Sequence, residues 1–174
     1  MKKPTTQPID PIIDQLLAIG LKKTAESLEN LYNSPEFLNL DRVELISRLV
    51  EPEYTTTTNR RYLSRLKLAH LSGCPQELNS CTDSSERSYM PEGVVKTLSS
   101  GNFIRNGMNI CILGASDSGK TYLAKALGIS ACSKFSVEYY DTEELIEQLS
   151  DVKVQSLKDY NKRKKHLCKL DLLI

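Results

Sequence analysis

The sequence lacks any long hydrophobic run, and this absence excludes a membrane-spanning protein. None of its 174 residues belongs to an apolar stretch long enough to cross a bilayer. Residues 1–7 lead into a helical pattern with interior charge, which is not typical of a signal peptide. The five cysteines are an odd number without a secretory signal, which indicates reduced thiols. We therefore expect a cytoplasmic protein with no membrane partner.

Excess charge and paired cysteine motifs are also lacking. The formal net charge is +1, so the bulk composition gives no indication of a polyanionic partner. His70, Cys74 and Cys81 lie near one another but include no CxxC pair, so we expect no zinc site. The other three cysteines, Cys111, Cys132 and Cys168, have apolar neighbours and are interpreted as small core residues.

The amino-terminal part of the chain predicts short helices. Asp10 is followed by a proline at a typical first helical position, and Gly20 ends that helix. Asp41 begins a later helix with a capping-box pattern. Pro52 should kink or end this helix, and the β-branched residues 55–58 predict a weak joint before the next one.

The helix expected at residues 59–71 is rich in basic side chains. No carboxylate occurs between Tyr54 and Gln76. At 3.6 residues per turn, one face carries Tyr62, Leu63, Leu66 and Ala69, and the other carries Arg60, Arg61, Arg65 and Lys67. The basic face fits either DNA phosphates or plain solvent, and the segment alone does not separate the two. His70, near the apolar side, is expected to be a core histidine.

Residues 114–121 match the phosphate-binding pattern GxxxxGK[ST]. The apolar run 110–113 before them predicts a short buried strand, and residues 122–127 keep helical apolar spacing. Backbone N–H groups of such a loop, at the positive end of a helix, enclose an anion. The residues expected to bind ATP are Gly114, Ala115, Ser116, Asp117, Ser118, Gly119, Lys120 and Thr121.

Three positions in this loop carry distinct expectations. Lys120 should reach the outer phosphates, and the Thr121 hydroxyl should bind the Mg²⁺ that bridges them. Asp117 stands where most such loops have glycine, although aspartate tolerates left-handed backbone better than most residues. A carboxylate about 6 Å from a phosphate charge costs about 1 to 3 kcal/mol. That cost would weaken ATP binding roughly 10- to 100-fold unless the side chain turns outward or Mg²⁺ screens it.

The remaining segments predict an α/β domain. Residues 73–91 indicate a linker, and a helix is expected from about residue 91 or 92 to residue 105. Strands are expected at 135–140 and 170–174, with helices at 143–149, capped by Asp141, and at 156–167. The basic run 162–166 at the end of the last helix is interpreted as solvent-facing. We thus expect a helical region at 1–72, a linker at 73–91 and a P-loop domain at 92–174.

At this point the whole chain resembles the IstB-like ATP-binding proteins, AAA+ helpers of insertion-sequence transposases that are relatives of replicative helicase loaders. The resemblance rests on RRYLSRLKLAHL, FIRNGMNICILGASDSGKTYLAKALG, VEYYDTEELIEQL and KLDLLI. It implies a three-layer P-loop NTPase core with a parallel sheet, preceded by a small all-helical region. It also implies a self-associating, ATP-dependent protein that binds DNA and recruits a transposase.

The resemblance also implies parts that this sequence does not show. In the family, acidic Walker B residues follow directly after the apolar run that ends here at Ile174, and Asp171 precedes that run. The sensor residues, the arginine finger and the strand between the P-loop and Walker B strands would follow later still. We therefore expect an incomplete P-loop core that at most binds nucleotide. Because its P-loop strand would lack neighbours, we expect marginal stability, or folding of the amino-terminal helices alone.

Three other functions remain open. A helicase loader would have a helicase as its partner in place of a transposase. A P-loop kinase for small molecules would usually begin close to its loop, whereas about a hundred residues precede this one. A degenerate, non-enzymatic remnant is compatible with Asp117 and with the missing carboxylates.

Overall fold

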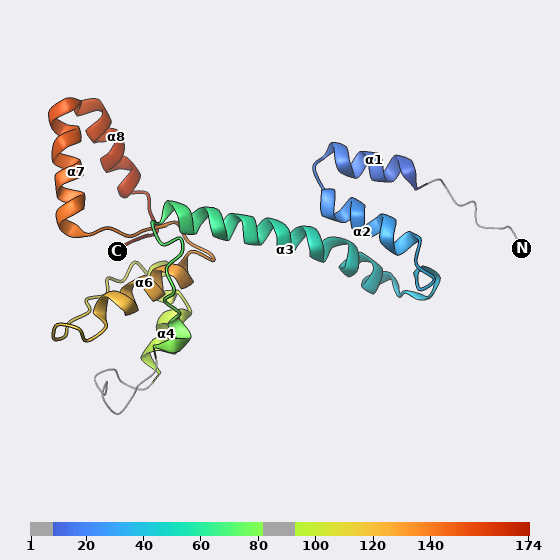
Figure 1. Cartoon of the computed structure of the whole chain (residues 1–174), viewed down its shortest axis with the longest axis horizontal. Coiled ribbons are helices and arrows are strands. Elements are labelled where there is room, and N and C mark those ends of the chain that lie inside the picture. Colours follow the sequence, from blue (N-terminus) through green and yellow to red (C-terminus); the bar gives the residue numbers. More distant parts are fainter. Residues whose placement is uncertain (1–8, 82–92) are drawn as a thin grey trace, which may run out of the picture. The chain divides into compact units, whose positions relative to one another are not determined.

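A computed structural model of the chain describes residues 9–81 and 93–174 (Figure 1). By its internal contacts the chain divides into a first unit, Met1–Arg61, and a second unit, Tyr62–Ile174. This division differs from the domain boundary expected at residue 72 because it falls inside a long helix. None of the described helices is both long and apolar enough to cross a lipid bilayer.

The first unit consists of helices, as the sequence predicts. Helix α1 (Asp10–Ala18) packs against α2 (Lys22–Tyr32), and a short 3-10 helix, η1 (Phe37–Asn39), precedes α3 (Arg42–Leu68). Gly20 lies between α1 and α2 with a φ of 86°, so the first helix ends where the sequence places its end. The Leu21 N–H then donates to the Leu16 carbonyl at 2.9 Å, which closes the turn.

Helix α3 is longer than the sequence predicts. Pro52 does not end the helix, and the weak joint expected at residues 55–58 is wrong, because one helix continues through both to Leu68. Proline removes a single backbone donor, and α3 has no buried residue, so water can hydrate the carbonyl that loses its partner. The β-branched residues each cost only a fraction of 1 kcal/mol, roughly, in helix propensity.

The single helix expected up to residue 105 is split in two. Helix α4 (Val94–Ser99) and helix α5 (Asn102–Arg105) are separated at Gly101, which has a φ of 70°. A Cβ at Gly101 would lie 2.7 Å from the Phe135 ring, so the chain turns tightly against that ring. The position where this helix was expected to begin, residues 91–92, lies outside the described residues.

The described part of the expected linker, residues 73–81, is packed. It contains the 3-10 helix η2 (Leu78–Ser80), which contacts α6 (Lys120–Ala131) and α4. Leu78 and Cys81 are both buried there. Two buried apolar side chains explain why this polar, glycine- and proline-containing segment adopts a fixed position. The rest of the expected linker, residues 82–91, lies outside the described residues.

The later strands and helices agree with the sequence. Strand β1 (Val137–Glu138) pairs in parallel with β2 (Leu172–Leu173), with Val137 opposite Leu172. Helices α7 (Thr142–Gln155) and α8 (Leu157–Leu167) connect the two strands. The Asp141 carboxylate accepts a hydrogen bond from the Glu143 N–H at 3.0 Å, which confirms it as the cap of α7, and α7 extends beyond its expected end at residue 149.

The sheet is smaller than the expected three-layer P-loop core. Within residues 9–81 and 93–174 it has two strands, β1 and β2, and the strand expected at residues 110–113 is not formed. A strand is defined by hydrogen bonds to a neighbouring strand, and no described segment pairs with residues 110–113. The α/β class and the parallel pairing are therefore present, in an incomplete form.

The core of the second unit consists of two hydrophobic clusters. The first, which we call the sheet cluster, joins the end of α3 to the end of α6 and to β1; its buried residues are Ala69, Leu71, Ala131, Cys132 and Val137. The second, the helix cluster, joins η2 to the middle of α6; its buried residues are Leu78, Cys81, Ala126 and Leu127. Helix α6 contributes to both clusters, so it is the central element of this unit.

Candidate nucleotide-binding site

The loop before α6 turns through two residues with left-handed backbone. Asp117 has a φ of 59°, and Gly119, which precedes the first residue of the helix, has a φ of 85°. The prediction that aspartate can adopt this backbone here is therefore confirmed. Together the two residues direct the chain into Lys120, so the loop 114–121 ends at the amino end of a helix of 12 residues.

The amino end of α6 offers backbone hydrogen-bond donors to a phosphate. At the start of α6, the Leu123 N–H donates to the Gly119 carbonyl at 2.9 Å. The N–H groups that precede the first such donor in an α-helix have no acceptor within the helix, and the helix dipole adds positive charge there. Thr121 is exposed in the first turn, so its hydroxyl is accessible.

Lys120 folds back over its own loop. Its ammonium group donates to the Ala115 carbonyl with a separation of 2.5 Å, and the Ser118 N–H reaches the same carbonyl at 3.4 Å. An ammonium held by a neutral carbonyl gains more from an anionic phosphate oxygen, since charge-assisted hydrogen bonds are stronger. The lysine is thus positioned for the exchange of one acceptor for the other.

The first residue of the loop, Gly114, lies close to later side chains of the same loop. A Cβ at Gly114 would lie 2.7 Å from the Ser118 hydroxyl oxygen and 3.7 Å from the Lys120 side chain. The chain at Gly114 therefore lies beside the Ser118 and Lys120 side chains of its own loop. These donors, a lysine and an accessible threonine hydroxyl fit a phosphate group accompanied by Mg²⁺.

The segment before the loop is more exposed than expected. Leu113 is 86% exposed, and Cys111 is also exposed, so the interpretation of Cys111 as a core residue is wrong. The same correction applies to Cys168, whereas Cys132 is fully buried as predicted. Burial raises the pKa of the Cys132 thiol to about 11, so this thiol stays protonated at neutral pH.

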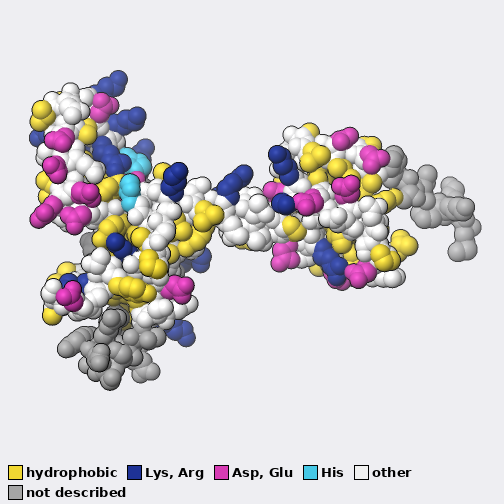
Figure 2. All heavy atoms as spheres, in the orientation of Figure 1, with side chains coloured by type: hydrophobic (Ala, Val, Ile, Leu, Met, Phe, Trp, Pro, Cys, Tyr) yellow, Lys and Arg dark blue, Asp and Glu magenta, His cyan; other side chains and the backbone are white. Residues whose placement is uncertain are grey.

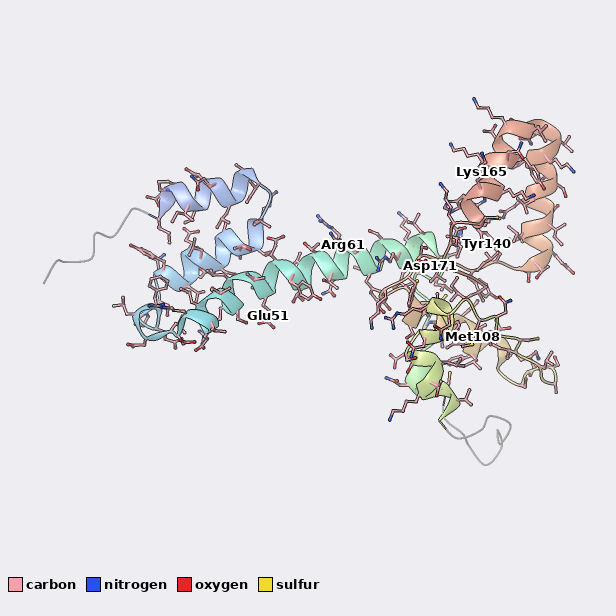
Figure 3. The ribbon with its side chains drawn as sticks, turned by 180° about the vertical axis from the view of Figure 1, so that it is seen from behind. Glu51, Arg61, Met108, Tyr140, Lys165 and Asp171 are labelled. Carbon is pink, nitrogen blue, oxygen red and sulfur yellow. The ribbon has the colours of Figure 1, made fainter. Side chains whose placement is uncertain are left out.

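The four basic residues proposed for DNA on α3 differ in their surroundings. Arg60, Arg61 and Lys67 are exposed, and Figure 3 shows the Arg61 side chain projecting from the helix. Arg65 is half-buried, and its guanidinium donates to the carbonyls of Cys132 at 3.3 Å and Ser133 at 3.0 Å. Arg65 therefore binds the end of α6.

The apolar face expected on the same helix is only partly used. Tyr62 and Leu66 pack on the sheet cluster and Ala69 lies within it, but Leu63 is 63% exposed. His70 is exposed, so its interpretation as a core histidine is wrong. The residue has a φ of 58°, and its ring lies 5.3 Å from the ring of Tyr140.

One buried ionic cluster was not foreseen. Glu138 on β1 is 5% exposed, and its carboxylate contacts the Tyr140 hydroxyl, the Arg163 guanidinium and His166 Nε2. Burial would raise the pKa of the Glu138 carboxyl, but hydrogen bonds from His166 and Tyr140 and the charge of Arg163 together hold the pKa below its usual value. The only signal in the sequence is a glutamate inside the apolar strand 135–140.

The basic run on α8 has two orientations. Arg163 and His166 turn toward Glu138, whereas Lys164 and Lys165 line an open hollow with Lys169. Figure 2 shows histidine side chains beside lysine and arginine side chains on one face. The interpretation of residues 162–166 as wholly solvent-facing is therefore correct only in part. No group of three or more His, Cys, Asp or Glu side chains in the described ranges is arranged to hold a metal.

Comparisons with known proteins show the family of this chain. Residues 14–174 match the family model of the IstB-like ATP binding proteins. The chain is 30% identical, over 93% of its length, to a protein of Pseudomonas fluorescens named as an ATP-binding protein of insertion sequence IS1162, of which 69% is covered. It is 30% identical, over 82% of its length, to the insertion sequence ATP-binding protein y4uH of Sinorhizobium fredii, of which 57% is covered.

A third relative, the insertion sequence ATP-binding protein y4pL of Sinorhizobium fredii, is 31% identical over 70% of this chain and is covered over 49% of its own length. The chain thus spans between about half and about two thirds of the length of these relatives.

Proposed function

The chain belongs to the family of IstB-like ATP-binding proteins, and on this premise we propose that it binds ATP with Mg²⁺ as a helper of insertion-sequence transposition. The observation that carries the proposal is the geometry of residues 114–121. Two left-handed residues, Asp117 and Gly119, turn the loop into the amino end of α6, with Lys120 folded over it.

Each part of the loop has a definite role in this proposal. The backbone N–H groups of the loop and of the first turn of α6 hold the phosphates. Lys120 exchanges the Ala115 carbonyl for an outer phosphate oxygen, and the Thr121 hydroxyl is a ligand of Mg²⁺. Bound Mg²⁺ would neutralise part of the phosphate charge. It would thereby reduce the repulsion expected between the phosphate and the Asp117 carboxylate.

The proposal extends to DNA and to protein partners. The exposed basic residues Arg60, Arg61 and Lys67 are suited to DNA phosphates, which release counterions when they bind such side chains. A transposase is the proposed protein partner, because the relatives are named as proteins of insertion sequences.

We also propose self-association. Val43, Ile46 and Val50 lie on one face of α3 and are all more than half exposed, which leaves an apolar stripe for a second copy of the chain.

Titration with a fluorescent methylanthraniloyl ATP, in the presence of Mg²⁺, tests the nucleotide site. The wild-type chain should bind, and Lys120→Ala should bind about 10-fold or more weakly, since a charge-assisted hydrogen bond is worth about 1.5 to 3 kcal/mol. Thr121→Val should lose the part of the affinity that depends on Mg²⁺, which a parallel titration in EDTA measures.

Lys134→Ala is the matched control for this titration. Lys134 has the same charge and lies just beyond the other end of α6, where it is exposed. Its replacement should leave the affinity unchanged. Equal affinities of the wild type and Lys120→Ala would show that the loop is not the nucleotide site.

A further inference from the structure

Arg65 was expected to contact DNA, but its surroundings indicate another role. The residue lies on the last turns of α3, and its Nη1 atom donates to both Cys132 O, at 3.3 Å, and Ser133 O, at 3.0 Å. Cys132 is the residue that ends α6. The last carbonyls of a helix lack partners within it and carry negative partial charge, so an arginine there satisfies and neutralises them.

We propose that Arg65 is a positioning residue of the nucleotide site, which acts by fixing the helix that carries Lys120 and Thr121. This inference rests on the proposed function at residues 114–121. Helix α6 has 12 residues, so about 18 Å of rigid helix separates the atoms that Arg65 holds from the loop. A rotation or slide of the helix at one end therefore moves the other end.

The loop depends on α6 more than a P-loop inside a full sheet would. The preceding residues, 110–113, form no strand in the described part of the chain, so no sheet hydrogen bonds hold the loop from that side. Leu113, the residue directly before the loop, is 86% exposed. The loop is thus supported by the helix that follows it and, on the other side, by Ile112, which packs against the helix cluster without sheet hydrogen bonds.

The apolar contacts of α6 hold the helix against its neighbours but do not define its rotation or its axial position. A Cβ at Gly128 would lie 2.7 Å from Ile174 and 2.8 Å from Leu71, so the middle of the helix is close-packed. Such contacts fix how near the helix lies, but they are non-directional. The two hydrogen bonds from Arg65 at the carboxyl end of α6 are directed, as is the bond from the Glu77 N–H to the Tyr122 hydroxyl at 3.3 Å in its first turn. The bonds from Arg65 are the ones that restrain the rotation and axial position of α6 at its far end.

Arg65 itself is firmly held. Just beyond it, the Ala69 carbonyl accepts a hydrogen bond from the Tyr139 N–H at 3.1 Å, which ties the end of α3 to the residue after β1. Ala69 is completely buried in the sheet cluster, and Leu66 packs against this cluster. The end of α3 that carries Arg65 is therefore fixed in place, so the hydrogen bonds of the guanidinium can restrain the position of α6.

The test compares three variants of the full chain by methylanthraniloyl-ATP titration well below their melting temperatures. Arg65→Gln should bind the nucleotide about 5- to 10-fold more weakly, and Arg65→Lys, which keeps one cationic donor, should recover part of that loss. Arg42→Gln is the matched control on the same helix, because Arg42 is exposed and belongs to neither proposed binding site, and it should bind like the wild type.

A second measurement separates positioning from plain stabilisation. Nucleotide should raise the melting temperature of Arg65→Gln by less than it raises that of the wild type. A merely structural role would lower the melting temperature of the variant equally with and without nucleotide, so the increase caused by nucleotide would match that of the wild type. If Arg65→Gln does not fold, an intermediate affinity of Arg65→Lys decides in the same way. Wild-type affinity of Arg65→Gln overturns the inference and spares the proposed function, and so does wild-type affinity of Arg65→Lys if Arg65→Gln does not fold. A wild type that binds no better than Lys120→Ala overturns both.

Discussion

The two units are built in different ways. Among the described residues of the first unit, Ala25 alone is buried, whereas the second unit contains the sheet cluster and the helix cluster. In the first unit, polar contacts at the surface hold helices together, such as the bond from the Lys23 N–H to Glu53 at 2.8 Å. The helices of the first unit thus form without a substantial hydrophobic core. The segments of the second unit are held around α6 by its two hydrophobic clusters.

The largest effect should come from the core of the second unit. Leu71 is 1% exposed and packs against Ala131, Cys132 and Val137. Leu71→Ala should lower the free energy of unfolding of this unit by about 2 to 5 kcal/mol, because it removes buried methyl groups and leaves a cavity. In the first unit, Leu28→Ala changes a half-buried side chain and should cost under about 1.5 kcal/mol.

Urea unfolding, monitored by hydrogen exchange in each of the two units, measures both changes. Equal losses in the two variants would contradict the difference between the units.

The next effect should come from the buried ionic cluster. Glu138→Gln removes a charge that faces Arg163 and His166, so it should destabilise the second unit by about 2 kcal/mol. The matched change in the first unit, Glu26→Gln, removes an exposed partner of Lys23 and should be without measurable effect. Thermal unfolding by circular dichroism compares the two variants.

The same cluster predicts how stability depends on pH. The pKa of Glu138 is lower in the folded chain than in the unfolded one, so the unfolded state binds more protons as the pH falls. The stability that Glu138 contributes is therefore complete above its ordinary pKa and is lost in the acidic range below it, as the pH falls through the lower pKa of the folded state. Hydrogen bonds from the backbone and side chain of Ser136 lower the pKa of Asp171 and add a loss of the same sign.

Melting temperatures of the wild type and Glu138→Gln over this pH range provide the measurement. The variant should show a shallower decline. A decline as steep as that of the wild type would assign the acid sensitivity to other carboxylates.

The exposed stripe of the first unit should matter for assembly and hardly for folding. Ile46→Glu places a charge in the centre of the stripe formed with Val43 and Val50. It should weaken self-association by about 10-fold, since burial of a side chain of this size is worth about 1.5 to 3 kcal/mol. Sedimentation velocity over a concentration series measures this. Glu51→Gln on the same helix is the control.

The smallest effect concerns DNA. Arg61→Gln should reduce the slope of the logarithm of the DNA affinity against the logarithm of the salt concentration by about 1. Arg65→Gln should leave this slope unchanged, because its guanidinium is bound to α6. Fluorescence anisotropy with a labelled duplex at several salt concentrations tests both. A reduced slope for Arg65→Gln would show that it contacts phosphates.

Local signals in the sequence predicted local structure well. Gly20 ends α1, Asp141 caps α7, and the strands at 137–138 and 172–173 lie within their expected ranges. Each of these depends on a residue and its close neighbours along the chain. The helix does not end at Pro52, because propensity is a weak contribution that the rest of an exposed helix can outweigh.

The errors at other positions have a common cause. The strand at 110–113, the exposure of His70 and the bonds of Arg65 all depend on which distant segments lie nearby. Neither hydrophobic spacing nor charge patterns contain that information. Glu138 escaped notice for the same reason, since its charged partners Arg163 and His166 are 25 and 28 residues away in the sequence.

The sequence by itself determined the pattern of the phosphate loop, the family and the helical character of the first unit, because each is encoded in short stretches of residue types and their spacing. Only the tertiary structure decided that the loop is supported from the side of α6, that Arg65 holds the far end of that helix, and that Glu138 is a buried anion. Those properties arise from contacts between segments that are distant in the chain, and such contacts exist only after the apolar clusters have formed.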